Sequence, residues 1–97
     1  MAIITLTTDF GIKDPYTAMV KGEIHKALKD VIIVDVSHEI QPFDIAEGAF
    51  VVKNSYKNFP DGSIHVIGVD SLITPNKKAL AALIDEHFFI ACDNGIL

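Results

Sequence analysis

The opening stretch, Ala2-Ile3-Ile4-Thr5-Leu6-Thr7-Thr8-Asp9-Phe10-Gly11, decides the fold of this chain. Residues 2–7 are β-rich and apolar on both faces, which is typical of an interior strand of a parallel sheet. The turn that follows puts the carboxylate of Asp9 at the end of this strand, with a rigid support beneath it and an open crevice in front. The sequence therefore predicts an α/β domain whose sheet edge binds a small molecule with hydroxyl groups, such as a nucleoside.

Helices and strands alternate along the next part of the chain. Asp14 is expected to cap a helix that has Pro15 at its first position and runs to about Lys29. The β-branched run at 31–36 predicts a second interior strand, which makes the unit βαβ. Asp44 and Glu47 match a capping box, so a second helix is expected over residues 45–56.

The last third of the chain predicts three further strands. Residues 63–69 form a strand that ends at Asp70, and residues 79–84 and 87–92 form a hairpin. The expected fold is therefore a Rossmann-like three-layer α/β domain, with mostly parallel strands, flanking helices and a C-terminal hairpin.

Composition excludes several classes of protein. The chain has 97 residues, 49% of them hydrophobic and 22% charged, which fits one globular domain. A net charge of −5 with scattered Lys and Arg argues against nucleic-acid binding. No apolar run approaches the roughly 20 residues that span a bilayer, and no basic lead suggests a signal peptide. A single cysteine, Cys92, fits the cytoplasm and is expected to be buried and inert.

Polar residues follow three of the expected strands: Asp9, the segment Ser37-His38-Glu39, and Asp70. Because parallel strands point the same way, these residues should share the carboxyl edge of the sheet, where such folds bind ligands. On spacing alone, local roles compete with ligand binding. Asp9 can cap its own turn, Asp14 can cap a helix, and His38 can hydrogen-bond near a strand end.

Metal and phosphate binding find little support in the sequence. Asp9, Asp14, His38 and Asp70 could converge as ligands in principle, but no short-spaced pair such as His-x-x-x-His accompanies them. Gly11 belongs to no Gly-x-Gly-x-x-Gly or Walker pattern. Neither a metal site nor a bound cofactor is therefore expected.

An ordered set of motifs resembles the S-adenosyl-L-methionine hydroxide adenosyltransferases over the whole chain. These enzymes hydrolyse S-adenosylmethionine to adenosine and methionine, and they are relatives of the fluorinase and chlorinase that use halide instead. The matching segments are Thr7-Thr8-Asp9-Phe10-Gly11, Asp14 with Tyr16, Lys21-Gly22, Val34-Asp35-Val36-Ser37-His38-Glu39-Ile40, Pro42 with Asp44, Glu47-Gly48-Ala49, Phe59-Pro60-Asp61-Gly62 and Asp93-Asn94-Gly95.

The resemblance implies roles for individual residues. Asp9 corresponds to the aspartate that holds the ribose 2′ and 3′ hydroxyls, and a carboxylate offers two acceptor oxygens for such a diol. Asp14 corresponds to a residue near the amino group of the methionine portion, and Phe43 to an aromatic residue beside the sugar. Asp70 matches the aspartate that positions the attacking water together with an arginine and a histidine. The substrate-binding set is then Asp9, Phe10, Asp14, Tyr16, Phe43 and Asn94, the last of these in a turn sequence.

The sequence departs from the family after Asp70. Family members continue with Pro-Gly-Val-Gly-Thr and an arginine seven positions on, whereas this chain has Ser71-Leu72-Ile73-Thr74-Pro75-Asn76-Lys77. Leucine and threonine do not take the positive φ of glycine without strain, so a different loop shape is expected. Lys77 keeps the charge of the arginine but not its planar fork. Asp70 and Lys77 are the catalytic candidates, while His65 and His87 are not expected to replace the family's histidine.

Relatives are two to three times longer, and their site forms between the N-terminal domain of one subunit and a C-terminal β-barrel of the next subunit in a trimer. The resemblance implies that residues 1–97 are an incomplete N-terminal α/β domain without that barrel, active only in the full-length homotrimer. The leading hypothesis is hydrolysis of S-adenosylmethionine, with water attacking the ribose C5′. The alternatives are a non-catalytic nucleoside-binding or assembly module, or a halogenase relative, although the carboxylate of Asp70 would repel a halide.

Overall fold

The computed structural model describes residues 2–11, 15–42, 44–69 and 79–92. Five strands, two α-helices and one short 3₁₀ helix make up this part of the chain. In chain order they are β1 (Ala2–Thr8), α1 (Tyr16–Ala27), β2 (Val31–Ser37), α2 (Ile45–Ser55), η1 (Tyr56–Asn58), β3 (Ile64–Gly68), β4 (Ala79–Ile84) and β5 (His87–Cys92).

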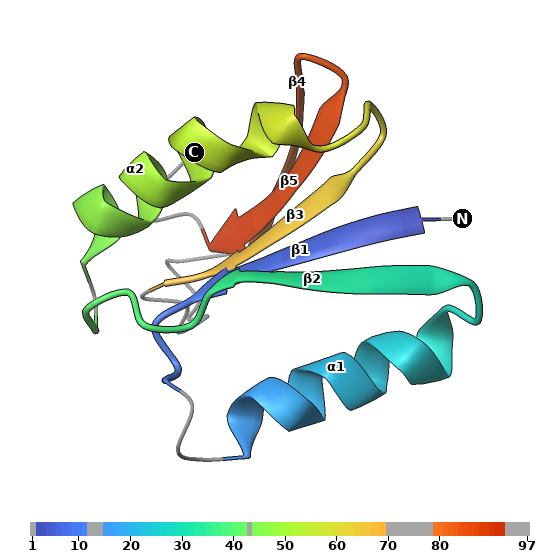
Figure 1. The fold of residues 1–97 in the computed structure, drawn as a ribbon. Coiled ribbons are helices and arrows are strands. Elements are labelled where there is room, and N and C mark those ends of the chain that lie inside the picture. Colours follow the sequence, from blue (N-terminus) through green and yellow to red (C-terminus); the bar gives the residue numbers. More distant parts are fainter. Residues whose placement is uncertain (1, 12–14, 43, 70–78, 93–97) are drawn as a thin grey trace.

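The strands form one sheet in the order β2-β1-β3-β5-β4. β1 pairs in parallel with β2 and β3, β3 pairs in parallel with β5, and β4 runs antiparallel to β5. Figure 1 shows α1 on one face of this sheet and α2 on the other, so the domain has three layers. The α/β fold class, the mostly parallel sheet and the C-terminal hairpin are confirmed.

The second strand was predicted to be interior, and that prediction is wrong for the described sheet. β2 lies at one edge, with β1 as its neighbour, and Ile32 is 45% exposed. β-branched runs favour strands in general, but position in a sheet depends on which strands pair later in the chain. Because β3 and β5 add on the far side of β1, it is β1 that becomes an interior strand, as predicted.

Both helices differ slightly from their predicted limits. α1 begins at Tyr16 rather than Pro15, which occupies the cap position, and Asp14 lies outside the described residues. α1 ends at Ala27 because Leu28 takes an extended conformation (φ −128°, ψ 119°) that leads into β2. α2 begins after Asp44, whose carboxylate accepts the Glu47 N–H at 3.0 Å, as half of the predicted capping box. The amide of Asp44 donates to the Gln41 carbonyl instead of to the Glu47 side chain.

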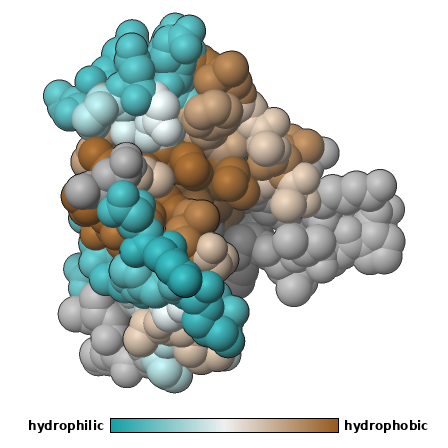
Figure 2. Space-filling model, turned by 90° about the vertical axis from the view of Figure 1, so that its right-hand side faces the viewer, coloured by the Kyte–Doolittle hydropathy of each residue, from teal (hydrophilic) through white to brown (hydrophobic). Residues whose placement is uncertain are grey.

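The main apolar core lies between α2 and the sheet. Its buried members come from both layers and from the segment before α2: Ile40, Val52, Ile67, Val69, Phe89 and Ala91. The opposite face is covered less completely, since α1 has no fully buried residue. In Figure 2 apolar side chains form a band across the middle of one side of the molecule, with hydrophilic residues above and below it. Within the described ranges, no helix has the length and apolar character needed to span a membrane.

Candidate functional site

The carboxyl ends of β1, β2 and β3 meet at one edge of the sheet. The Asp9 N–H donates to the Gly68 carbonyl at 3.3 Å, which ties the end of β1 to that of β3. The Gly11 N–H donates to the His38 carbonyl at 2.7 Å, which ties the same turn to the end of β2. The structure thus ties the ends of β2 and β3 to the turn that carries Asp9, as predicted, whereas Asp70 itself lies outside the described residues.

The turn that carries Asp9 is held by both backbone and side-chain contacts. Gly11 has φ +75°, a conformation that glycine adopts without strain. The Phe10 N–H donates to Thr8 Oγ1 at 3.3 Å, and the Thr17 hydroxyl at the start of α1 donates to the Gly11 carbonyl at 3.4 Å. The backbone around Asp9 is therefore fixed on both sides of the carboxylate.

Two of the predicted substrate-binding residues lie together beside this turn. The rings of Phe10 and Tyr16 have their centroids 6.3 Å apart with a tilt of 57°, and Tyr16 is 57% exposed. The Phe10 ring packs against Gly68, where an added Cβ would lie 3.1 Å from Phe10 Cζ. A larger residue at 68 would push the ring and with it the turn. Gly68 at the end of β3 therefore allows the close approach of the Phe10 ring, a contact that the sequence did not predict.

Beneath the turn lies a run of polar contacts that reaches from β1 to α1. His38 Nδ1 lies 2.6 Å from Thr8 Oγ1, and its Nε2 lies 2.7 Å from Asp35 Oδ1. Lys21 Nζ donates to Asp35 Oδ2 at 2.6 Å. The hydrogen-bonded role predicted for His38 is confirmed, whereas the parts played by Thr8, Asp35 and Lys21 were missed. The feature of the sequence that could have indicated these contacts is Asp35, an acidic residue inside an otherwise apolar strand.

The charge state of Asp35 follows from these neighbours. Burial is the largest single influence and raises the pKa of its carboxyl. Hydrogen bonds from Lys21 and His38, together with the charges of these residues, lower the pKa, and their combined effect leaves it below the ordinary 3.8. Asp35 is therefore an ionised acceptor for both partners at neutral pH.

A second buried polar cluster lies on the α2 face of the sheet. His65 Nδ1 lies 2.6 Å from Thr5 Oγ1, and His65 Nε2 lies 3.0 Å from His87 Nδ1. His87 Nε2 in turn lies 3.8 Å from Asp61 Oδ1. Burial, and secondarily the charge of His87, lowers the pKa of His65 to about 4. This cluster packs against the rings of Tyr56 and Phe89.

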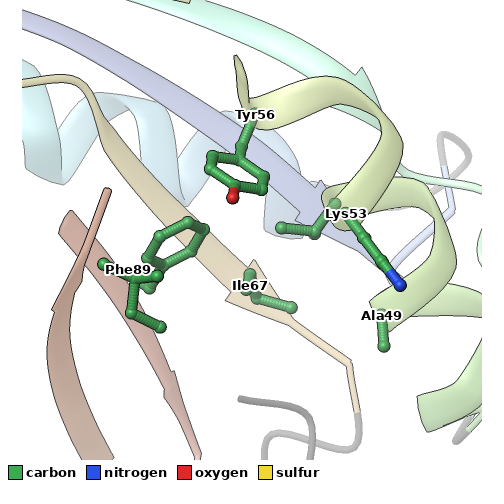
Figure 3. Close-up of a pocket in the computed structure, with 7 residues that line it drawn as sticks. Ala49, Lys53, Tyr56, Ile67 and Phe89 are labelled. Carbon is green, nitrogen blue, oxygen red and sulfur yellow. The ribbon is translucent and has the colours of Figure 1, made fainter. Parts of the chain in front are cut away.

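Two cavities open on the two faces of the sheet. One of about 240 Å³ lies between α2 and the strands β3, β4 and β5, and Figure 3 shows Tyr56, Phe89, Ile67, Ala49 and Lys53 around it. The other, of about 200 Å³, lies on the α1 face and includes Thr8, Phe10 and Gly68 in its lining. Both are lined mainly by apolar side chains. The second is continuous with the turn that carries Asp9, because Phe10 belongs to both.

The remaining predicted site residues, Asp14, Phe43, Asp70, Lys77 and Asn94, lie outside the described residues, and so does the side chain of Cys92. His38 is unsuited to the metal site considered from the sequence, because both of its ring nitrogens already have partners. Over the described ranges, no group of three His, Cys, Asp or Glu side chains is placed to hold a metal ion.

A mostly parallel sheet with helices on both faces and a braced turn at its carboxyl edge defines a three-layer α/β domain. The family model described as the SAM hydroxide adenosyltransferase N-terminal domain matches residues 4–97, so the chain belongs to this family. The chain is 38% identical over 99 residues to the (R)-S-adenosyl-L-methionine hydrolase of Methanocaldococcus jannaschii, covering 97% of this chain and 37% of that protein. A fluorinase of Nocardia brasiliensis is 39% identical over 62 residues, covering 64% of this chain and 21% of the fluorinase.

Solved structures agree with the fold. A conserved hypothetical protein from Thermus thermophilus superimposes with a TM-score of 0.87 at 28% identity, covering 99% of this chain and 40% of the other. An uncharacterised conserved protein from Thermotoga maritima gives a TM-score of 0.89 at 28% identity, covering 97% and 36%. The chain thus spans well under half the length of the relatives it matches.

Proposed function

We propose that this chain is the N-terminal portion of an enzyme that hydrolyses S-adenosyl-L-methionine to adenosine and L-methionine. The observation that supports this most directly is the braced turn at the carboxyl edge of β1, which carries Asp9 next to Phe10, whose ring lies near that of Tyr16. Membership of the family and the hydrolase names of several relatives point to the same chemistry.

In this proposal Asp9 accepts hydrogen bonds from the ribose 2′ and 3′ hydroxyls. Phe10, Tyr16 and Phe43 flank the nucleoside, Asp14 lies near the ammonium of the methionine portion, and Asn94 contributes from the segment after β5. An aspartate suits a diol because its two oxygens can each accept one hydrogen bond, and charged acceptors make the stronger bonds.

The reaction would be a displacement at C5′. A water oxygen forms the new bond to C5′ while the C5′–sulfur bond breaks, its electron pair stays on the methionine sulfur, and the proton that the water loses passes to the Asp70 carboxylate and then to solvent. The sulfonium is already a good leaving group, so positioning and partial desolvation of the water supply most of the rate. We assign the positioning of this water to Asp70, with Lys77 in place of the family's arginine.

The complete site would need more than this chain. We propose a homotrimer in which the site is shared between subunits, acting in the cytoplasm without a cofactor. The 97 residues alone are then expected to be inactive, because relatives of this domain are more than twice as long.

Calorimetric titration of the full-length protein with adenosine and with S-adenosylmethionine tests the proposal, combined with chromatographic analysis of products. Asp9→Asn should weaken adenosine binding, whereas Asp70→Ala should abolish product formation and leave adenosine binding intact. Absence of binding to either compound would contradict the proposal.

A non-catalytic nucleoside-binding module is the second candidate, and the altered segment from Ser71 to Lys77 favours it. In that case the full-length protein would bind adenosine but form no methionine. Asp70→Ala would then have no turnover to reduce. A halogenase is the weaker alternative, and it would show 5′-halogenated adenosine only when halide is supplied.

A further inference from the structure

The polar contacts beneath the candidate site form one continuous path from α1 to the Asp9 turn. Lys21 holds Asp35 at 2.6 Å, Asp35 holds His38 Nε2 at 2.7 Å, and His38 Nδ1 meets Thr8 Oγ1 at 2.6 Å. The path ends where Thr8 Oγ1 accepts the Phe10 N–H at 3.3 Å. The hydroxyl of Thr8 is thus the last link between the imidazole and the turn.

The carboxylate of Asp35 fixes the direction of the hydrogen bond between this residue and His38. The ionised Asp35 carboxylate can only accept, so His38 donates its Nε2–H to it. In a neutral ring Nδ1 accepts from the Thr8 hydroxyl, whereas in a protonated ring Nδ1–H donates to Thr8 Oγ1. That leaves the lone pairs of Thr8 Oγ1 facing the Phe10 N–H. Every group on the path therefore has a partner in either state of the ring.

Burial makes these contacts hard to replace with water. Thr8 and His38 are both buried, at 2% and 7% exposure. A buried hydroxyl or ring nitrogen without a partner is costly, so the hydroxyl of Thr8 is held to one rotamer by His38. His38 also accepts the Gly11 N–H through its own carbonyl at 2.7 Å, and so contacts the turn at two points.

We propose that His38, oriented by Asp35, is a positioning residue that fixes the Asp9-Phe10-Gly11 turn in its binding conformation through the Thr8 hydroxyl. Its consequence for ligand affinity rests on the proposed function, whereas its effect on the turn itself does not. His38 does not touch the ligand in this scheme. His38 orients the turn that carries Asp9, as residues hydrogen-bonded to the ligands of a metal ion orient those ligands.

The same strand offers a matched control. Thr5 is buried like Thr8, and its hydroxyl lies 2.6 Å from the Nδ1 atom of a buried histidine, His65. This pair lies on the other face of the sheet, in a cluster away from the turn. Removing either hydroxyl should cost similar stability, but only the loss of the Thr8 hydroxyl should loosen the turn.

Amide hydrogen exchange of the full-length protein, read by NMR, tests the effect on the turn without any ligand. We expect Thr8→Val and His38→Ala to speed exchange at the Gly11 amide about tenfold or more relative to the core strands. Thr8→Ser, which keeps the hydroxyl, should restore the wild-type rate, and Thr5→Val should leave the Gly11 amide unchanged. Equal exchange at Gly11 in Thr8→Val and Thr5→Val would overturn the proposal.

Adenosine affinity supplies the second readout. If the turn holds the ribose, Thr8→Val should weaken adenosine binding about tenfold or more, with rescue by Thr8→Ser and no change in Thr5→Val. Unchanged affinity in Thr8→Val would refute the link to binding. A wild-type protein that binds no adenosine would instead remove the proposed function, and exchange at Gly11 would still decide the positioning role. If His38→Ala fails to fold, His38→Asn keeps an acceptor near Nδ1 and should resemble the wild type at the turn.

Discussion

At the scale of single residues, His65 should make stability depend on pH. Its pKa is lowered from 6.5 to about 4, first by burial and then by the charge of His87. The unfolded chain therefore binds a proton between pH 6.5 and 4 that the folded chain does not. The contribution of His65 to the free energy of unfolding should be full above pH 6.5, fall as the pH drops to about 4, and then level off. The total loss should be about 1–3 kcal/mol once solvent screening of the charged ring is allowed for.

Urea unfolding at pH 7, 5.5 and 4 measures this dependence. His65→Gln should reduce the difference in unfolding free energy between pH 7 and pH 4. His25→Gln is the matched control, because His25 lies exposed on α1 and should leave the difference unchanged. The same pH dependence in both variants would mean that His65 is not the group responsible.

The sequence predicted part of this residue-level picture. It placed His38 as a hydrogen-bonded residue at a strand end, because polar residues near strand ends commonly find such partners. It did not predict that His65 and His87 meet. Their contact requires β5 to pair with β3, whereas a hairpin alone would equally allow β4 to be that neighbour. Contacts between strands distant in sequence depend on sheet order, which local patterns do not encode.

At the scale of elements, the β4–β5 hairpin carries a strained turn. Asp85 and Glu86 have φ of 51° and 65°, so both central residues are left-handed, as a type I′ turn requires. Glu86→Gly should stabilise the domain by about 0.5–1 kcal/mol, because glycine avoids the left-handed penalty at some cost in chain entropy. Thermal or urea unfolding measures the gain. Glu86→Ala removes the same charge but keeps Cβ, and an equal gain there would assign the effect to charge.

The start of α2 provides a second element-level prediction. The Asp44 carboxylate accepts the Glu47 N–H at 3.0 Å and satisfies one of the helix's free amides. Asp44→Ala should lower the free energy of unfolding by about 1 kcal/mol, whereas Asp44→Asn, which keeps an acceptor oxygen, should lower it much less. Similar losses in both variants would indicate that the negative charge matters more than the hydrogen bond.

Element limits were predicted best where local chemistry decides them. The limits of β4 and β5 match the prediction, since turn residues separate two apolar runs. The Asp44 cap was likewise predicted from spacing. α1 was less accurate, because its end depends on Leu28 turning toward β2, and β2 was misplaced in the sheet because edge position is a property of the whole fold.

At the scale of the whole molecule, the face of the sheet that carries α1 is only partly covered. Phe89 packs into the core on the α2 side, so its neighbours Phe88 and Ile90 point to the opposite face, where Leu83 is the cross-strand partner of Phe88. Leu83 is 61% exposed and Phe88 46%, on the two strands farthest from β2. Contiguous apolar surface of this kind marks contact with other protein surface.

We therefore expect the 97-residue chain on its own to associate as its concentration rises, in a way that depends on this face. Sedimentation velocity over a range of concentrations measures the association, and Phe88→Lys or Leu83→Lys should shift the distribution toward monomer because a charge on that face resists desolvation. Met19→Lys is the control, since Met19 is 58% exposed but lies on α1. A monomeric wild-type chain, or equal dissociation by Met19→Lys, would show that the β4–β5 face does not drive association.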